Sequence, residues 1–261
     1  MPSTVTAPDG AAIAYDSQGA GPDLVLVHGI TESRRTWDPL LSRLTGSWRV
    51  ARVDLRGHGE SARRPPYEAD VMAGDVRAVV DALGLEAPLV VGHSMGGAVV
   101  SLYAGLGYPA RAVVDVDQPL ELSGFQELVA GIRPMLEGDQ AGFRAAMELV
   151  FGALYGPLPD AERARLVELA HPEQDVVLGV WGGMLDLPAA ELDALVDAGL
   201  AGIDVPFLSL HGGDPGPDYA DWLRARVSGA VVEVWPDLGH YPHLMEPERF
   251  VARLADFDPA R

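Results

Sequence analysis

The sequence predicts an α/β fold in which a mostly parallel sheet carries helices on both faces. Short apolar segments alternate with helical periodicities along much of the chain, and this alternation is typical of parallel sheets. A G-x-S-x-G pentapeptide at residues 92–96 lies between one such segment and the helix that follows it. With 261 residues, of which 48% are hydrophobic, the chain is long enough to bury a large core.

Eight segments are expected to form strands, because each is short, apolar and bounded by turn residues. The first two flank Asp9 and Gly10, a dipeptide that is typical of hairpin turns. The segments are residues 4–7, 11–15, 23–27, 49–54, 87–91, 112–117, 205–212 and 230–235.

Helices are expected between these strands wherever apolar residues recur with helical spacing. In the alternating part of the chain they fall at residues 33–44, 69–83, 96–104, 218–227 and 247–257. Between the sixth and seventh strands only helical patterns occur, at residues 125–137, 141–155, 160–169, 175–185 and 189–199. We therefore expect residues 1–117 and 205–261 to form the core. Residues 118–204 are expected to form a helical cap over the C-terminal edge of the sheet.

Charge and composition exclude several classes of function. The formal net charge is −19, and all 19 basic residues are arginine, so Schiff-base chemistry and a serine–lysine dyad are excluded. The acidic balance argues against nucleic acid or an anionic membrane as a partner. The chain contains no cysteine, which removes disulfides and thiolate nucleophiles.

The sequence also lacks the apolar segments that targeting or membrane insertion requires. Residues 1–10 have neither the basic nor the apolar region of a signal peptide, and no uninterrupted apolar stretch approaches 18 residues. We therefore expect a cytoplasmic protein that acts on a small molecule.

Ser94 is the candidate nucleophile. It follows a buried strand and precedes a helix, so its hydroxyl is expected to stand above the sheet edge on a strained turn. Gly92 and Gly96 remove the Cβ atoms that would collide with the neighbouring strand and helix.

Four motifs in this order resemble the α/β-hydrolase family. They are His-Gly at residues 28–29, Asp-Leu-Arg-Gly-His-Gly-Glu-Ser at residues 54–61, the Ser94 pentapeptide and Gly-His at residues 239–240. The resemblance implies an eight-stranded, mostly parallel sheet and a serine hydrolase with a helical cap. It also implies His240 as the catalytic base and the main-chain amides of Ile30 and Met95 as the oxyanion hole.

The acid that orients His240 has two candidates. The resemblance places it most often after the seventh strand, where Asp214 stands one residue early in a shortened loop. Fewer family members, including the zearalenone lactone hydrolases that this chain loosely resembles, place it at the position of Asp117. Both remain candidates, with Asp117 slightly preferred. Asp115 lies deeper in the same strand and is expected to be neutral, hydrogen-bonded or paired with an arginine.

Two other histidines lie near these motifs. His93 is expected to pack beneath Ser94, and His243 is expected at the surface or behind the site. No cofactor or metal is expected, because no group of His, Asp and Glu has convincing ligand spacing.

These residues favour acyl transfer, with an apolar carboxylic ester or lactone as the substrate. The same residues would also suit a C–C bond hydrolase, a thioesterase or a slowly turning-over binding protein on this scaffold. The serine disfavours epoxide hydrolase and haloalkane dehalogenase chemistry, which in this fold uses an aspartate. The pair Ile30-Thr31 departs from the aromatic residue and proline that perhydrolases usually carry after His-Gly.

Specificity is expected to come from the cap. Its aromatic residues could line an apolar pocket, although most of them are expected to pack cap helices against the sheet. Trp181 is the best candidate for substrate contact, since Gly182 and Gly183 beside it would let a ligand approach closely. The other aromatic candidates are Phe125, Phe143, Phe151 and Tyr155.

Overall fold

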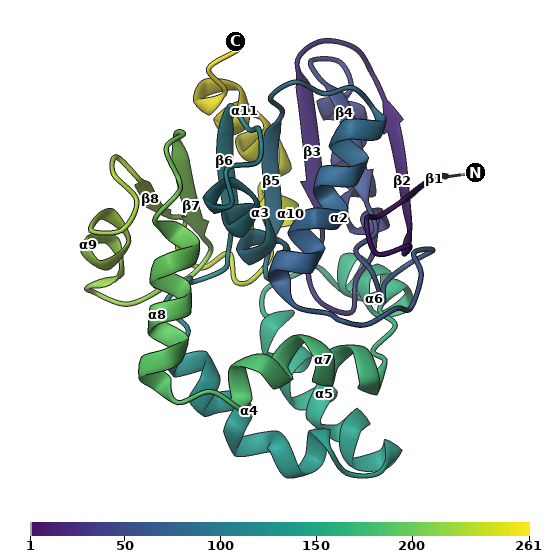
Figure 1. Ribbon diagram of the computed structural model, residues 1–261, viewed down its shortest axis with the longest axis vertical. Helices are drawn as coiled ribbons and strands as arrows, with labels where there is room; N and C mark the ends of the chain where they lie inside the picture. The colour runs from purple at the N-terminus through teal and green to yellow at the C-terminus, as the bar shows by residue number, and fades with distance from the viewer. Residues whose placement is uncertain (1) are drawn as a thin grey trace.

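An eight-stranded sheet runs through the computed structural model, which describes residues 2–261 (Figure 1). Its spatial order is β1-β2-β4-β3-β5-β6-β7-β8. The strands are β1 (Ser3–Thr6), β2 (Ala12–Gln18), β3 (Asp23–Val27), β4 (Arg49–Val53), β5 (Leu89–His93), β6 (Ala112–Val116), β7 (Phe207–His211) and β8 (Val231–Val234). All eight predicted strands are confirmed, with bounds that shift by a few residues.

Strand direction places the candidate site at one edge of this sheet. β2 runs antiparallel to both β1 and β4, and the hairpin turn between β1 and β2 contains Gly10 at a φ of 91°. From β4 through β8 the strands are parallel, so their carboxyl ends meet at a single edge. In open α/β sheets this edge is where ligands bind.

Helices cover both faces of the sheet, which explains why the central strands are mostly apolar. Successive residues of β3 illustrate the two sides, because Val25 and Val27 belong to one core and Leu24 and Leu26 to the other. The first core packs against α2 (Ala69–Ala82) and α3 (Met95–Gly105), and the second against α11 (Pro247–Phe257). In Figure 1, α2 and α3 lie in front of the sheet and α11 behind it.

Five helices lie between β6 and β7, and their bounds agree with the prediction to within two residues. Figure 1 shows α4, α5 and α7 beyond the carboxyl edge of the sheet, while α8 returns toward β7. α8 packs along α3, where a Cβ on Gly105 would come within 1.7 Å of the Gly199 carbonyl oxygen. The five are α4 (Ser123–Leu136), α5 (Gln140–Leu154), α6 (Asp160–Leu169), α7 (Gln174–Leu185) and α8 (Ala189–Leu200).

Three short elements differ from the prediction. The helix expected at residues 33–44 is a 3₁₀ helix over Arg34–Leu40 followed by α1 (Leu41–Leu44), because Pro39 has no N–H to continue an α-helical ladder. α9 (Tyr219–Arg224) ends three residues earlier than expected, and α10 (Pro242–Met245) was not expected. Within residues 2–261 no helix combines the length and apolar character that spanning a bilayer requires.

A buried ion pair anchors the loop after β4. Arg56 is 1% exposed, and its guanidinium donates to both carboxylate oxygens of Asp75 on α2 at 2.6 and 2.7 Å. The same guanidinium donates to Asp9 in the β1–β2 turn at 2.9 Å. Arg56 therefore joins the loop after β4 to α2 and to the β1–β2 turn, three segments that are distant in sequence.

Replacing Arg56 with methionine is expected to destabilise the fold by about 3–5 kcal/mol, because Asp75 would be left buried without its cation. Urea unfolding measures the change. The matched control is Arg64→Met, since Arg64 is exposed and lies 3.7 Å from Asp9. We expect Arg64→Met to lower the free energy of unfolding by about 0–1 kcal/mol. Equal losses for the two variants would contradict a special role for the buried pair.

Candidate active site

Ser94 stands on a sharp turn between β5 and α3. Its φ of 52° and ψ of −128° lie in a strained region for a residue with a Cβ. The turn is possible because its neighbours are glycines. A Cβ on Gly92 would come within 2.0 Å of the Gly96 carbonyl oxygen, and one on Gly96 within 2.5 Å of the Val27 carbonyl oxygen.

The structure brings Asp117 to His240. Asp117 follows β6 with a φ of 55°, and its Oδ2 lies 2.7 Å from His240 Nδ1. Its other oxygen accepts a hydrogen bond from the Gly212 amide at 2.7 Å. Burial favours a higher pKa for the Asp117 carboxyl, but His240 and the Gly212 amide outweigh it and lower that pKa below its ordinary value. Asp117 is therefore ionised and orients the imidazole through Nδ1.

The other candidate acid lies elsewhere. Asp214 is exposed in the loop after β7, and its Oδ1 accepts a hydrogen bond from the Gly216 amide at 2.9 Å. The shortened loop thus closes on itself. Of the two carboxylates left open by the sequence, only Asp117 contacts His240 among the described residues.

A cavity of about 410 Å³ opens above Ser94. Ser94, His240 and both expected oxyanion residues, Ile30 and Met95, lie on its wall. Met95 is the first residue of α3, so its N–H has no acceptor within the helix and lies at the positive end of the helix dipole. The remaining lining residues are Asp117, Gln118, Pro119, Glu121, Gly124, Phe125, Val150, Phe151, Leu154, Trp181 and Pro215.

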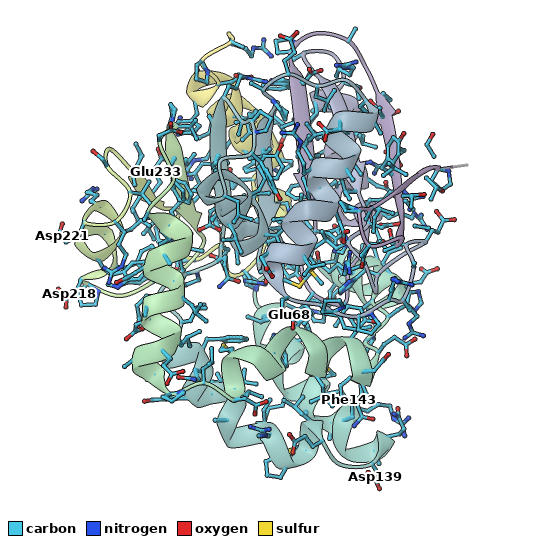
Figure 2. All side chains as sticks on the ribbon, in the orientation of Figure 1. Glu68, Asp139, Phe143, Asp218, Asp221 and Glu233 are labelled. Carbon is cyan, nitrogen blue, oxygen red and sulfur yellow. The ribbon has the colours of Figure 1, made fainter. Side chains whose placement is uncertain are left out.

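The helices between β6 and β7 supply the apolar wall. Phe125, Phe151 and Trp181 line the cavity, with the Phe125 and Trp181 rings edge to face at 5.7 Å. Phe143, labelled in Figure 2, is instead buried among these helices, and Tyr155 stacks on Tyr241. The two glycines after Trp181 are not part of the wall.

The polar groups of the cavity are mainly acidic or neutral. Glu121 and Asp117 are its carboxylates, Gln118 is its amide, and His240 is the one titratable base on the wall. No arginine lines the cavity. A bound molecule therefore meets a largely apolar surface with negative charge near the nucleophile.

The sequence motifs did not mark Glu32 as a residue of the site. It is buried three residues after Gly29, and its Oε2 accepts a hydrogen bond from the Gly29 amide at 3.0 Å. Oε2 also lies 3.4 Å from His93 Nδ1, and Tyr241 donates its hydroxyl to Oε1 at 2.9 Å. The signal in the sequence is a glutamate in the loop that follows the buried strand β3 and the His-Gly motif, where a buried carboxylate needs partners.

Two further expectations are settled by burial. His243 is fully buried beside Trp37 and His93, so the surface position considered for it is wrong. Asp115 is also fully buried and accepts a hydrogen bond from Ser209 at 3.0 Å. Burial raises the pKa of Asp115 well above its ordinary value, which agrees with the neutral side chain expected there. Within residues 2–261 no three His, Asp or Glu side chains converge as a metal site.

The comparison with known families rests on nearly the whole chain. The family model described as "Alpha/beta hydrolase family" matches residues 24–253, a span that contains Ser94, Asp117 and His240. The chain belongs to the α/β-hydrolase family. This assignment agrees with the eight-stranded sheet and the turn at Ser94.

Relatives of this α/β-hydrolase carry several activities in their names. A non-heme haloperoxidase of Rhodococcus erythropolis is 32% identical over 255 residues, which cover 90% of this chain and 92% of that protein. A pimeloyl-[acyl-carrier protein] methyl ester esterase of Neisseria meningitidis serogroup A is 29% identical over 251 residues, 89% of this chain and 75% of the relative. The solved esterase RhEst1 from Rhodococcus sp. ECU1013 has a TM-score of 0.74 and 27% identity, with 98% of each chain covered.

Asparagine in place of Asp117 is expected to lower turnover of an ester by about 10⁴-fold, because the amide cannot hold the imidazole in the required tautomer. Steady-state kinetics with a chromogenic ester measures the loss. Asp214→Asn is the matched control and is expected to keep the wild-type rate. The reverse pattern would show that Asp214 is the acid.

Proposed function

We propose that this α/β-hydrolase cleaves carboxylic esters or lactones through an acyl-enzyme on Ser94. The observation that carries the proposal is the opening of Ser94, His240 and Asp117 onto one cavity, with His240 Nδ1 held by Asp117 at 2.7 Å. The esterases among its relatives support ester hydrolysis as the reaction.

In the proposed reaction, His240 Nε2 takes the proton of the Ser94 hydroxyl as Oγ attacks the carbonyl carbon of the substrate. The resulting oxyanion accepts hydrogen bonds from the amides of Ile30 and Met95. When the intermediate collapses, the C–O bond to the leaving group breaks and His240 gives its proton to the departing alkoxide. For a lactone the alcohol stays attached to the acyl group.

Water completes the cycle. His240 removes a proton from a water molecule as the oxygen attacks the acyl-enzyme, and the second oxyanion occupies the same two amides. Ser94 then leaves with the proton from His240, and a carboxylic acid is released. Asp117 stays ionised throughout and stabilises the imidazolium that forms in each half of the cycle.

The wall of the cavity favours a neutral, apolar, medium-sized acyl group. Phe125, Phe151 and Trp181 offer apolar contact area, while Glu121 would repel a carboxylate on the substrate. No arginine on the wall could neutralise such a charge. Perhydrolysis is not proposed, because Ile30 and Thr31 replace the aromatic residue and proline expected for it.

Exposure to a fluorophosphonate, followed by intact mass, tests the nucleophile. Wild type is expected to gain one adduct and to hydrolyse short- and medium-chain aryl esters, while Ser94→Ala does neither. If wild type stays unlabelled and inactive although folded, the protein is a ligand-binding protein on a hydrolase scaffold and the proposal fails. Faster turnover of thioesters than of esters would identify a thioesterase, and faster cleavage of C–C substrates would identify a C–C bond hydrolase.

Substrate charge is tested with two aryl esters of similar size, a butyrate and a hemisuccinate. We expect wild type to prefer the neutral butyrate, and Glu121→Gln to raise the relative kcat/KM of the hemisuccinate about fivefold by removing like-charge repulsion of about 1 kcal/mol. Glu127→Gln is the matched control, since Glu127 is exposed on α4 and lies outside the cavity wall. An unchanged ratio in Glu121→Gln would contradict this account of specificity.

A further inference from the structure

Glu32 lies where the three loops that carry the reacting groups meet. Its carboxylate contacts Gly29, His93 and Tyr241, at 3.0, 3.4 and 2.9 Å. Each of these residues is the sequence neighbour of a group in the proposed mechanism. Gly29 precedes the oxyanion residue Ile30, His93 precedes Ser94, and Tyr241 follows His240.

His93 connects Glu32 to His240, the proposed base. Its Nε2 lies 2.8 Å from the main-chain oxygen of His240, an atom that can only accept, so Nε2 carries a proton. Nδ1 faces the Glu32 carboxylate, which also only accepts when ionised. Both ring nitrogens are satisfied as donors when His93 is an imidazolium, which makes His93 and Glu32 a buried ion pair.

The surroundings of the pair agree with these charges. Burial alone would lower the pKa of His93, but the Glu32 carboxylate outweighs it and raises that pKa. Burial alone would raise the pKa of Glu32, and His93, His28 and Tyr241 outweigh it and lower that pKa. The rings of His240, Tyr241 and His243 all pack against His93 with centroids 4.7 Å away.

We propose that Glu32 and His93 are positioning residues that set the distance between the base and the oxyanion hole. Asp117 holds the side chain of His240, and His93 holds its main chain. Glu32 ties that arrangement to Gly29 and hence to Ile30. Neither residue lines the cavity, so neither contacts the substrate. The inference rests on the proposed function, since it assigns Glu32 and His93 to the Ser94 chemistry.

Glu32→Gln keeps the shape of the side chain but cannot accept hydrogen bonds at both positions. An amide NH₂ placed toward Gly29 would meet another donor, and one placed toward Tyr241 would remove the acceptor of the Tyr241 hydroxyl. We expect kcat to fall about 10- to 100-fold with KM nearly unchanged, because small displacements of reacting groups cost rate and not binding.

His93→Phe removes the donor to His240 while keeping a ring in the same place, and the expected loss is of similar size. His93→Gln retains a donor that can reach the His240 oxygen and is expected to recover part of the rate. The matched control is His243→Phe. His243 belongs to the same buried aromatic group, but neither of its ring nitrogens has a hydrogen-bond partner within residues 2–261, so its rate should stay near wild type.

Fluorophosphonate labelling separates positioning from simple loss of folded protein. The endpoint counts intact sites, and the labelling rate and kcat per labelled site report their geometry. If Glu32→Gln and His93→Phe are labelled to the same final extent as wild type but more slowly, the proposal is supported. If only a small fraction of each variant is labelled, and that fraction has the labelling rate and kcat of wild type, the proposal is overturned and the pair has a structural role only. If wild type itself neither labels nor turns over, the proposed function fails instead, which is a distinguishable result.

Discussion

The site depends on the close approach of main chain at Gly92, Gly96 and Val27. With no Cβ at the two glycines, the start of α3 lies directly against the ends of β3 and β5. The same contact places the loop after β3, which carries Ile30, and the start of α3, which carries Met95, on the wall of one cavity beside the strained turn at Ser94. A side chain at either glycine would separate the two strands from the helix and disturb Ser94 together with the amides of Ile30 and Met95.

Around that contact, two carboxylates constrain His240 from different sides. Asp117 takes an unusual backbone conformation at the end of β6, which places its side chain between the Gly212 amide and the imidazole. Glu32 does not contact His240 itself but contacts His93 and Tyr241, which lie against it. Glu32 is buried and Asp117 is partly buried, and the cost of desolvating each carboxylate is offset by its hydrogen bonds. The imidazole of His240 is therefore fixed in orientation as well as in position.

The parts of this arrangement that could be predicted from the sequence are those with local signals. Strand and helix periodicity located the sheet and the five inserted helices, and the glycines around Ser94 marked the turn. The choice between Asp117 and Asp214 could not be made, because it depends on how a loop of a few residues closes in space. Glu32 was not marked and a surface position for His243 stayed open for a similar reason, since the burial of both depends on segments that come together only in the folded chain.

The proposed reacting groups and the apolar wall of the cavity come from different stretches of the chain. Ile30, Ser94, Asp117 and His240 are carried by loops at the sheet edge, whereas most of the apolar wall comes from α4, α5 and α7. Substitutions in those helices can reshape the space offered to a substrate while the hydrogen bonds around Ser94 and His240 stay as they are. Evolution and protein engineering can thus vary which molecule enters without rebuilding the machinery that acts on it.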